Sequence, residues 1–300
     1  MNAPIIVFAF NRPDALKACI EGLQRNSEAA YSDLFVFVDG PRSDREGESA
    51  KVASVREYAS SITGFHMVET HFSDVNRKLG PSIIAGVTDV INRYGRAIII
   101  EDDLIATSNL LSFLNQGLDR YESNREVFSV CGYTNKVRVP KDYTYDAFFC
   151  SRSSSWGWAT WKDRWNSCEW EFADWEAVEP DHKAFNRWGG SDCFGMLKDW
   201  KEGRNQSWAI RFCYNQFKQN AVSLFPVLSL IDNEGFDGSG TNCKKFNRYK
   251  FELDRSGRKE FRMPETVIKD KRLYKESLRY YSIPIRIYSR LMNMYYDLKG

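Results

Sequence analysis

The sequence predicts an α/β protein built around a mainly parallel β-sheet that is flanked by helices. In the first 100 residues, short apolar runs alternate with longer segments of helical spacing. Polar or charged residues follow each apolar run. A chain of 300 residues can form one such domain with appendages, because α/β units of this length often surround a single sheet.

Four strands and three helices account for these 100 residues. The apolar run 5–10 predicts the first strand, and Pro13, which suits the first turn of a helix, opens a helix that continues to about Arg25. The pattern then repeats, with strands at 34–38, 66–72 and 96–100 and helices at 48–61 and 80–94. A helix at about 108–122 and a strand near 128–131 should follow. Ligands of such sheets bind beyond the carboxyl ends of the strands, so functional residues should lie there.

Composition excludes several classes of protein. Hydrophobic residues make up 43% and charged residues 27% of the chain, as in folded globular proteins and unlike disordered or fibrous ones. The N-terminus lacks the basic segment of a signal peptide, and no segment has 18 consecutive apolar residues. The 7 cysteines are scattered and lack the spacing of a zinc site. We therefore expect a cytoplasmic protein.

The C-terminal part of the chain is basic. Residues 244–300 contain 16 Lys and Arg but 7 Asp and Glu, although the net charge of the whole chain is only +2. Interleaved tyrosines and isoleucines, together with Pro284, favour contact with anionic lipid over contact with nucleic acid. We expect a helical extension that attaches to the inner face of the plasma membrane. A basic helix packed against the main domain is an equally good interpretation.

Three consecutive carboxylates, Glu101, Asp102 and Asp103, follow the apolar strand 96–100. Three adjacent acids are unfavourable unless a positive group neutralises them. Mg²⁺ and Mn²⁺ are bound by one or two carboxylates together with phosphate oxygens and water. The run is therefore a candidate metal site that would hold a diphosphate. The alternative is the acidic beginning of the helix near residue 108.

Charged residues also follow the other strands. Arg12, Arg77 and Lys78 could contact the base or phosphates of a nucleotide, and Asp39 could accept a hydrogen bond from uracil or ribose. Each of these residues taken singly is more often a helix cap or a surface ion pair. Their shared position at strand ends favours binding.

A tryptophan-rich segment lies at 153–170. The rings of Trp156 and Trp158 could stack on a sugar or belong to the core, whereas Trp161 and Trp165, four residues apart on an expected helix, are assigned to the core. The glycine-rich segment 232–243 could be a mobile lid or a simple long turn.

In this order, the residues resemble the inverting GT-A glycosyltransferases, and among them the N-acetylglucosaminyltransferase that begins complex N-glycan branching and its bacterial relatives. The resemblance spans about residues 4–245. It is carried by Phe8-Ala9-Phe10-Asn11-Arg12-Pro13, Val38-Asp39-Gly40, Asn76-Arg77-Lys78, Glu101-Asp102-Asp103-Leu104, Trp156-Gly157-Trp158, Ser207-Trp208-Ala209-Ile210-Arg211 and Gly238-Ser239-Gly240-Thr241.

The resemblance implies roles for these residues. Asp103 would ligate Mn²⁺ or Mg²⁺, Asp102 would face the ribose, and Arg12 and Asp39 would contact the uridine of a nucleotide-sugar donor. Further donor contacts are expected from Phe10, Asn11, Asn76, Arg77 and Lys78, and the acceptor would lie against Trp156, Gly157, Trp158 and Trp208.

The sequence departs from this family at the catalytic base, which is an Asp just before the tryptophan that matches Trp208. Here Gln206 stands at the position of the expected base, and an amide cannot remove a proton at neutral pH. Asp192 or Glu202 could supply the base from a neighbouring segment, or Gln206 could be a substitution made to trap a complex. Asn242 also stands where bacterial relatives often have His.

We therefore predict a GT-A catalytic domain at 1–245, with a donor half at 1–105 and an acceptor half at 106–245, and a basic helical extension at 246–300. The predicted reaction moves a sugar from a UDP-sugar or another nucleotide sugar to a glycan or lipid-linked glycan, as in the synthesis of bacterial surface polysaccharides. The alternatives are a catalytically impaired or non-catalytic carbohydrate-binding relative and a sugar nucleotidyltransferase.

Overall fold

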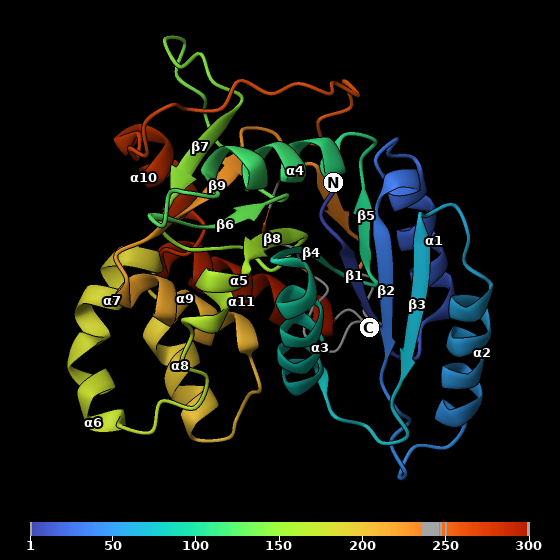
Figure 1. The fold of residues 1–300 in the computed structure, drawn as a ribbon. Helices are drawn as coiled ribbons and strands as arrows, with labels where there is room; N and C mark the ends of the chain where they lie inside the picture. Colours follow the sequence, from blue (N-terminus) through green and yellow to red (C-terminus); the bar gives the residue numbers. More distant parts are fainter. Residues whose placement is uncertain (1, 236–245, 247, 250, 299–300) are drawn as a thin grey trace.

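The computed structural model describes residues 2–235, 246, 248, 249 and 251–298. This part of the chain forms an eight-stranded sheet with helices on both faces, a small two-stranded sheet and a pair of C-terminal helices (Figure 1). The predicted fold class, a mainly parallel sheet flanked by helices with a helical C-terminal extension, is confirmed.

The large sheet has the strand order β3-β2-β1-β4-β8-β6-β9-β7. Its strands are β1 (Ile5–Ala9), β2 (Asp33–Val38), β3 (Met67–Phe72), β4 (Arg96–Glu101), β6 (Val127–Cys131), β7 (Ala147–Cys150), β8 (Trp158–Trp161) and β9 (Val222–Pro226). The pairs β3-β2, β2-β1, β1-β4 and β6-β9 are parallel, whereas β8 runs antiparallel to β4 and β6, and β7 runs antiparallel to β9. Strands β5 (Leu104–Ala106) and β10 (Ile231–Asn233) form the small antiparallel sheet.

The helices of the N-terminal half lie close to their predicted positions. They are α1 (Pro13–Gln24), α2 (Glu48–Ser61), α3 (Leu79–Tyr94) and α4 (Leu110–Tyr121). Pro13 occupies the first turn of α1, and α3 ends at Gly95, whose φ of 82° lets the chain turn directly into β4.

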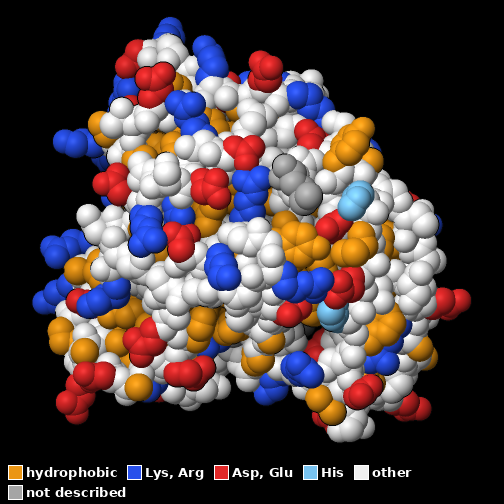
Figure 2. Space-filling model, viewed as in Figure 1, with side chains coloured by type: hydrophobic (Ala, Val, Ile, Leu, Met, Phe, Trp, Pro, Cys, Tyr) orange, Lys and Arg blue, Asp and Glu red, His pale blue; other side chains and the backbone are white. Residues whose placement is uncertain are grey.

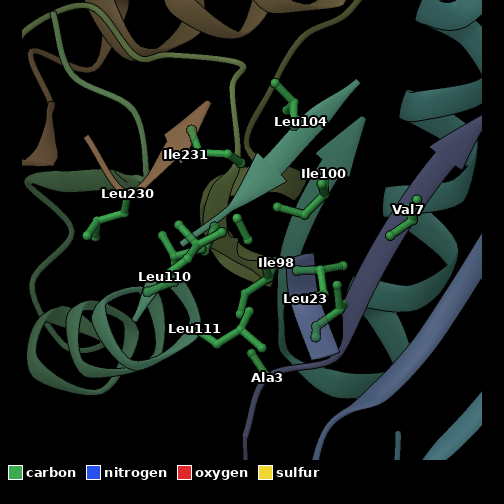
Figure 3. Packing of buried hydrophobic residues seen from close by; sticks show 14 of the residues in the cluster. Ala3, Val7, Leu23, Ile98, Ile100, Leu104, Leu110, Leu111, Leu230 and Ile231 are labelled. Carbon is green, nitrogen blue, oxygen red and sulfur yellow. The ribbon is translucent and has the colours of Figure 1, made fainter. Parts of the chain in front are cut away.

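Side chains of the central strands alternate between two cores on opposite faces of the sheet. Ile5 and Val7 point toward α1, α2 and α4, and Ile6 and Phe8 point toward α3 and the tryptophans of the C-terminal half. Figure 3 shows part of the first core, in which β1, β4, β5 and β10 meet α1 and α4. Because both faces are buried, the strands are continuous apolar runs in the sequence.

The C-terminal half adds a helical layer beside the sheet. Its elements are α5 (Lys162–Asn166), α6 (Trp175–Val178), the 3₁₀ turn Glu179–Asp181, α7 (His182–Gly189), α8 (Cys193–Lys201) and α9 (Trp208–Lys218). A second 3₁₀ turn, Ala29–Tyr31, lies in the N-terminal half between α1 and β2. Trp161 and Trp165 are buried, as predicted. Their expected common helix is wrong, because Trp161 is the last residue of β8 and only Trp165 lies on α5.

The C-terminal extension packs on the main sheet. Among its described residues, helix begins only at α10 (Lys271–Arg279) and continues in α11 (Ile283–Leu298). Before α10 the chain crosses β7 and α4, where Arg258 pairs with Asp146 at 2.7 Å and the Phe261 N–H donates to Gln116 Oε1. Across the described ranges, no helix has the length and hydropathy needed to cross a membrane. On the face seen in Figure 2, side chains of both charges are interspersed with small hydrophobic patches.

Candidate functional site

A cleft of about 1640 Å³ opens at the carboxyl ends of β1, β2 and β4. Its other wall comes from segments 152–156 and 205–210, from Arg248 and Tyr249, and from the inner face of α11. The predicted site residues that line this cleft are Phe10, Asn11, Arg12, Asp39, Asn76, Arg77, Lys78, Asp102, Asp103, Trp156, Gln206 and Trp208. The common location of the residues that follow β1, β2, β3 and β4 is explained by the parallel strands, and the individual roles of all these residues stay predictions.

Asp39 organises the loop that leads into α3. Its Oδ1 accepts hydrogen bonds from the N–H groups of Gly40 and Arg77, and its Oδ2 accepts one from the N–H of Lys78 at 2.9 Å. Lys78 has φ 68°, which is unfavourable for a residue other than glycine. The hydrogen bond from the Lys78 N–H to Asp39 therefore holds a strained backbone. Three of the roughly four lone-pair positions of this carboxylate are thereby used inside the protein.

The loops after β2 and β3 lock together beside Asp39. The Asn76 side-chain amide donates to the carbonyl of Gly40 at 2.8 Å. A Cβ on Gly40 would overlap the backbone of Val75, so only glycine permits this close approach. Asn76 therefore has a structural partner as well as a place in the cleft wall.

A buried carboxylate fixes the loop after β1. Glu48, 5% exposed, accepts from the Asn11 side chain at 3.0 Å and from the backbone and guanidinium of Arg42. The guanidinium of Arg42 also lies 5.5 Å from the ring centroid of Phe10. Arg42 lines the cleft, and the sequence analysis missed it because an arginine in a polar loop carries no periodic signal.

The hydrogen bonds to Glu48 predict a pH dependence of stability. The hydrogen bonds from Arg42 lower the pKa of Glu48 from 4.5 to about 2 in spite of burial. The charge of Arg42 and the hydrogen bond from Asn11 add to this effect. A lowered folded-state pKa contributes stability above pH 4.5, and this contribution is lost as the pH falls toward 2. In urea titrations, the difference in unfolding free energy between wild type and Glu48→Gln should therefore shrink as the pH falls from 4.5 to 2. Glu57→Gln, an exposed change on α2, is the control, and a pH-independent difference for Glu48→Gln would contradict the prediction.

The acidic run lies at the end of β4, as predicted. Arg12 Nη2 donates to Asp102 Oδ1 and lies 3.2 Å from Asp103 Oδ2, so it supplies part of the neutralising charge. Burial, followed by the charges of Asp103 and Asp102, raises the pKa of Glu101 to about 8. Burial also raises the pKa of Asp102 to about 6, against the lowering effect of Arg12.

Oxygen atoms suited to a divalent cation remain at this position. Asp102 Oδ2 is buried and has no hydrogen-bond partner among the described residues. The pairing of β10 with β5 brings Asn233 into the cleft and places Gly235 so close to Asp103 Oδ2 that a Cβ would crowd it. Carboxylate and amide oxygens fit Mg²⁺ or Mn²⁺, which take the rest of their ligands from phosphate and water. In residues 2–235 and the described part of the tail, no group of three or more His, Cys, Asp or Glu is placed to hold a metal.

Gln206 is exposed and lines the cleft just before Ser207, whose hydroxyl caps α9 by accepting from the Ile210 N–H. A Cβ on Gly80 would overlap the carbonyl oxygen of Gln206, so this loop touches the beginning of α3. Glu202, one alternative base, is outside the cleft lining and pairs with Arg204 on the surface.

Asp192, the other alternative base, is buried behind the cleft wall. It accepts from Arg152 at 2.7 Å, lies 3.7 Å from Arg248 and is also close enough to Arg286 to feel its charge. Burial acts to raise the pKa of Asp192, but these arginines outweigh burial and lower it. A carboxylate held in this way is a weak base, and Asp192 lies in an ion-pair cluster outside the lining of the cleft. Arg152 and Arg248 line the cleft, and the sequence analysis did not single them out.

The tryptophan segment divides between the cleft and the core. Trp156 lines the cleft, with its ring centroid 4.3 Å from Tyr133 and 5.7 Å from Tyr249. Trp158 is 1% exposed and stacks on Trp208 at 4.9 Å, so its ring cannot reach a ligand without rearrangement. Gly157 is buried and has φ 60°.

The buried Gly157 serves strand packing. The Gly157 carbonyl accepts a hydrogen bond from the Gly132 N–H at 2.6 Å. A Cβ on Gly157 would overlap the side chain of Ile231. Gly157 and Trp158 are thus part of the core behind the cleft, in contrast to their expected acceptor contacts. Most of the predicted lid, including Asn242, lies outside the described residues.

Comparisons with known proteins give a limited result. No protein-family model matches the chain, and no curated protein matches it. Among solved structures, it is similar to the mannosyltransferase PcManGT from Pyrobaculum calidifontis in complex with GDP-Man and Mn²⁺, with 9% identity, a TM-score of 0.39 and coverage of 54% of this chain and 46% of that chain. S. aureus TarS gives 12% identity and a TM-score of 0.33 over 49% of this chain and 25% of that one. The structure of TarS residues 1–349 gives 10% identity and a TM-score of 0.36, over 54% of this chain and 47% of that one. The chain thus spans less than half the length of these glycosyltransferases, and a likeness of this size does not determine a reaction or ligand.

Proposed function

We propose that this protein is a metal-dependent inverting glycosyltransferase of the GT-A type, which moves a sugar from a nucleotide-sugar donor to a glycan acceptor. The observation that carries the proposal is the position of Asp102 and Asp103 at the end of β4, in one cleft with the residues that follow β1 and β2. Sequence motifs far apart in the chain share one cleft, as a nucleotide-sugar site requires.

In this proposal the donor occupies the wall formed by β1, β2 and α3. Phe10 and Arg42 offer a flat ring and a guanidinium for the nucleotide, and Arg77 and Lys78 bring positive charge to the same wall. Asp103 and the free oxygen of Asp102 would hold Mn²⁺ or Mg²⁺. When bound, the ion would stabilise negative charge on the departing diphosphate.

The acceptor lies on the opposite wall, against Trp156 and Trp208. Its hydroxyl oxygen forms a bond to the anomeric carbon while the bond from that carbon to the diphosphate oxygen breaks on the other side. The proton of the hydroxyl passes to a base other than Gln206, because an amide cannot accept it at neutral pH. We propose surface-glycan synthesis as the setting of this transfer.

A non-catalytic carbohydrate-binding protein is the second candidate. Gln206 favours it, since it stands in the cleft at the position expected for the base. A sugar nucleotidyltransferase has less support, because the first strand is followed by Asn11-Arg12-Pro13 instead of a glycine-rich loop.

The decisive experiment measures nucleoside diphosphate release from a panel of UDP-, GDP- and dTDP-sugars, with Mn²⁺ or with EDTA, and calorimetric binding of the free nucleotides and of glycans. Transfer predicts metal-dependent nucleotide binding and metal-dependent release. Metal-dependent nucleotide binding without release from any donor would indicate a catalytically impaired relative, whereas calorimetric binding of glycan without metal-dependent nucleotide binding would favour the carbohydrate-binding protein. Absence of nucleotide binding under all conditions would overturn both the donor site and the proposed reaction.

A further inference from the structure

Helix α11 has its polar and apolar faces reversed relative to an ordinary surface helix. Ser289 and Asn293 are each 8% exposed and line the cleft, so two polar side chains point into the protein. The described side chains on the solvent side are Ile283, Pro284, Ile287, Tyr288, Arg290, Leu291, Met294, Tyr295, Tyr296 and Leu298. Only Arg290 in that set is charged. A helix in contact with water would place its apolar side chains inward.

The exposed apolar residues form a continuous line. Ile283, Ile287, Leu291, Met294 and Leu298 follow one another at intervals of four, four, three and four residues, which places them on one face of the helix. Their exposed fractions run from 56% to 86%. We call these five residues the apolar stripe. Exposed aliphatic side chains in a contiguous row mark a surface that another phase or molecule covers.

Positive charge lies on the preceding helix. In α10, Leu273 packs on the sheet while Lys271, Arg272, Lys275 and Arg279 are exposed. We call these four residues the basic rim. Only three residues separate α10 from α11, so the basic rim and the apolar stripe belong to one C-terminal helix pair.

We propose that this helix pair docks on an anionic lipid bilayer, with α11 lying in the headgroup region and the apolar stripe facing the acyl chains. An apolar face on one helix and exposed lysines on the helix before it in the chain match the interface of such a bilayer, where apolar burial and attraction to anionic headgroups act together. Tyr288 and Tyr295 beside the stripe suit the headgroup level. With 16 residues, α11 is shorter than the roughly 20 needed to cross a bilayer, so it lies along the surface.

Charge favours a lipid surface over a second copy of the chain. Arg272 of the basic rim pairs with Asp142 and Asp270, whereas Lys271 and Lys275 have no ion pair among the described residues. Two helix pairs meeting stripe to stripe would therefore bring unneutralised lysines of the two copies together. An anionic surface instead attracts the same charges.

Docking in this orientation would bring the cleft close to the membrane. The inner face of α11 forms part of the cleft wall, and a helix with its side chains is only about 10 Å thick. If the proposed glycosyl transfer holds, an acceptor carried by a lipid could reach the cleft from the bilayer. The docking itself does not depend on that reaction.

The test is co-sedimentation of the full chain with vesicles of phosphatidylcholine alone or mixed with phosphatidylglycerol. We expect wild type to sediment with the mixed vesicles and less with phosphatidylcholine alone. Leu291→Glu should weaken this partitioning at least about tenfold, because it replaces an aliphatic side chain in contact with the acyl chains by a charge. Lys271→Ser and Lys275→Ser should each weaken binding to the mixed vesicles by about fivefold and leave binding to neutral vesicles unchanged.

The matched control is Tyr31→Glu, which places the same charge at a residue 72% exposed and outside the helix pair. It should sediment like wild type, and circular dichroism should show every variant folded. The proposal is overturned if wild type does not sediment with anionic vesicles, or if Leu291→Glu and Tyr31→Glu behave alike. It is also overturned if ultracentrifugation shows a wild-type dimer that Leu291→Glu separates while no variant binds vesicles. None of these outcomes depends on turnover, so failure of docking and failure of the proposed reaction are distinguishable.

Discussion

Asp103→Asn is expected to lower kcat/KM for sugar transfer by at least about 10³-fold, since loss of a metal contact removes several kcal/mol of transition-state stabilisation. The substitution keeps the size of the side chain and removes one negative charge beside Arg12 and Gly235. Metal-dependent binding of the nucleotide should weaken in parallel. Nucleotide diphosphate release and calorimetry with and without Mn²⁺ measure the two effects.

Asp119→Asn is the control for this prediction. Asp119 is an exposed carboxylate on α4 that pairs with Arg96 away from the cleft, so its loss should change transfer little. Equal activity of Asp103→Asn and wild type would show that the acidic run does not act on the donor. A fall in activity for Asp103→Asn with unchanged metal-dependent nucleotide binding would assign Asp103 a role other than metal ligation.

Asp192→Asn is expected to lower the free energy of unfolding by about 3–5 kcal/mol, the range found when one partner of a buried ion pair is removed. The neutral amide would leave the half-buried Arg152 and Arg248, and the nearby Arg286, without the negative charge of Asp192. Urea denaturation followed by tryptophan fluorescence measures the loss. Activity at a temperature where the variant is folded should stay within a few-fold of wild type.

The surface pair between Asp199 and Arg204 provides the control. Asp199→Asn makes the same chemical change at an exposed pair and should alter stability by no more than about 1 kcal/mol. A folded Asp192→Asn protein of wild-type stability that had lost activity by about 10²–10⁴-fold would instead identify Asp192 as the base.

The N-terminal half could be predicted closely because its signals are local. The predicted strands at 5–10, 34–38, 66–72 and 96–100 differ from the observed ones by at most one residue at either end. Apolar runs, Pro13 and Gly95 act within a few residues, so they determine where strands and helices begin and end. Parallel pairing then brings the residues after the strands to one edge.

The C-terminal half was harder to predict because its arrangement depends on distant contacts. The apolar run 224–231 contributes to two sheets, since part of it lies in β9 and Ile231 begins β10. Trp158 could have contacted an acceptor or packed in the core, and only the position of Trp208 on α9 decides for the core. The described residues of the extension before α10 form no helix. They are held against the main domain by contacts such as the ion pair between Arg258 and Asp146.

In the acidic run, too, the sequence determined the local arrangement and distant contacts determined the rest. The sequence by itself determined that Glu101, Asp102 and Asp103 follow a buried strand and that Gln206 cannot be a base. Only the tertiary structure placed Arg12 against two of the acids, brought Gly235 beside Asp103 and turned the apolar side of α11 to solvent. The physical reason is that the spacing of residues along the chain determines local conformation, whereas charge pairing and exposure depend on residues such as Arg12 and Asp102, 90 positions apart, that meet only in the folded protein.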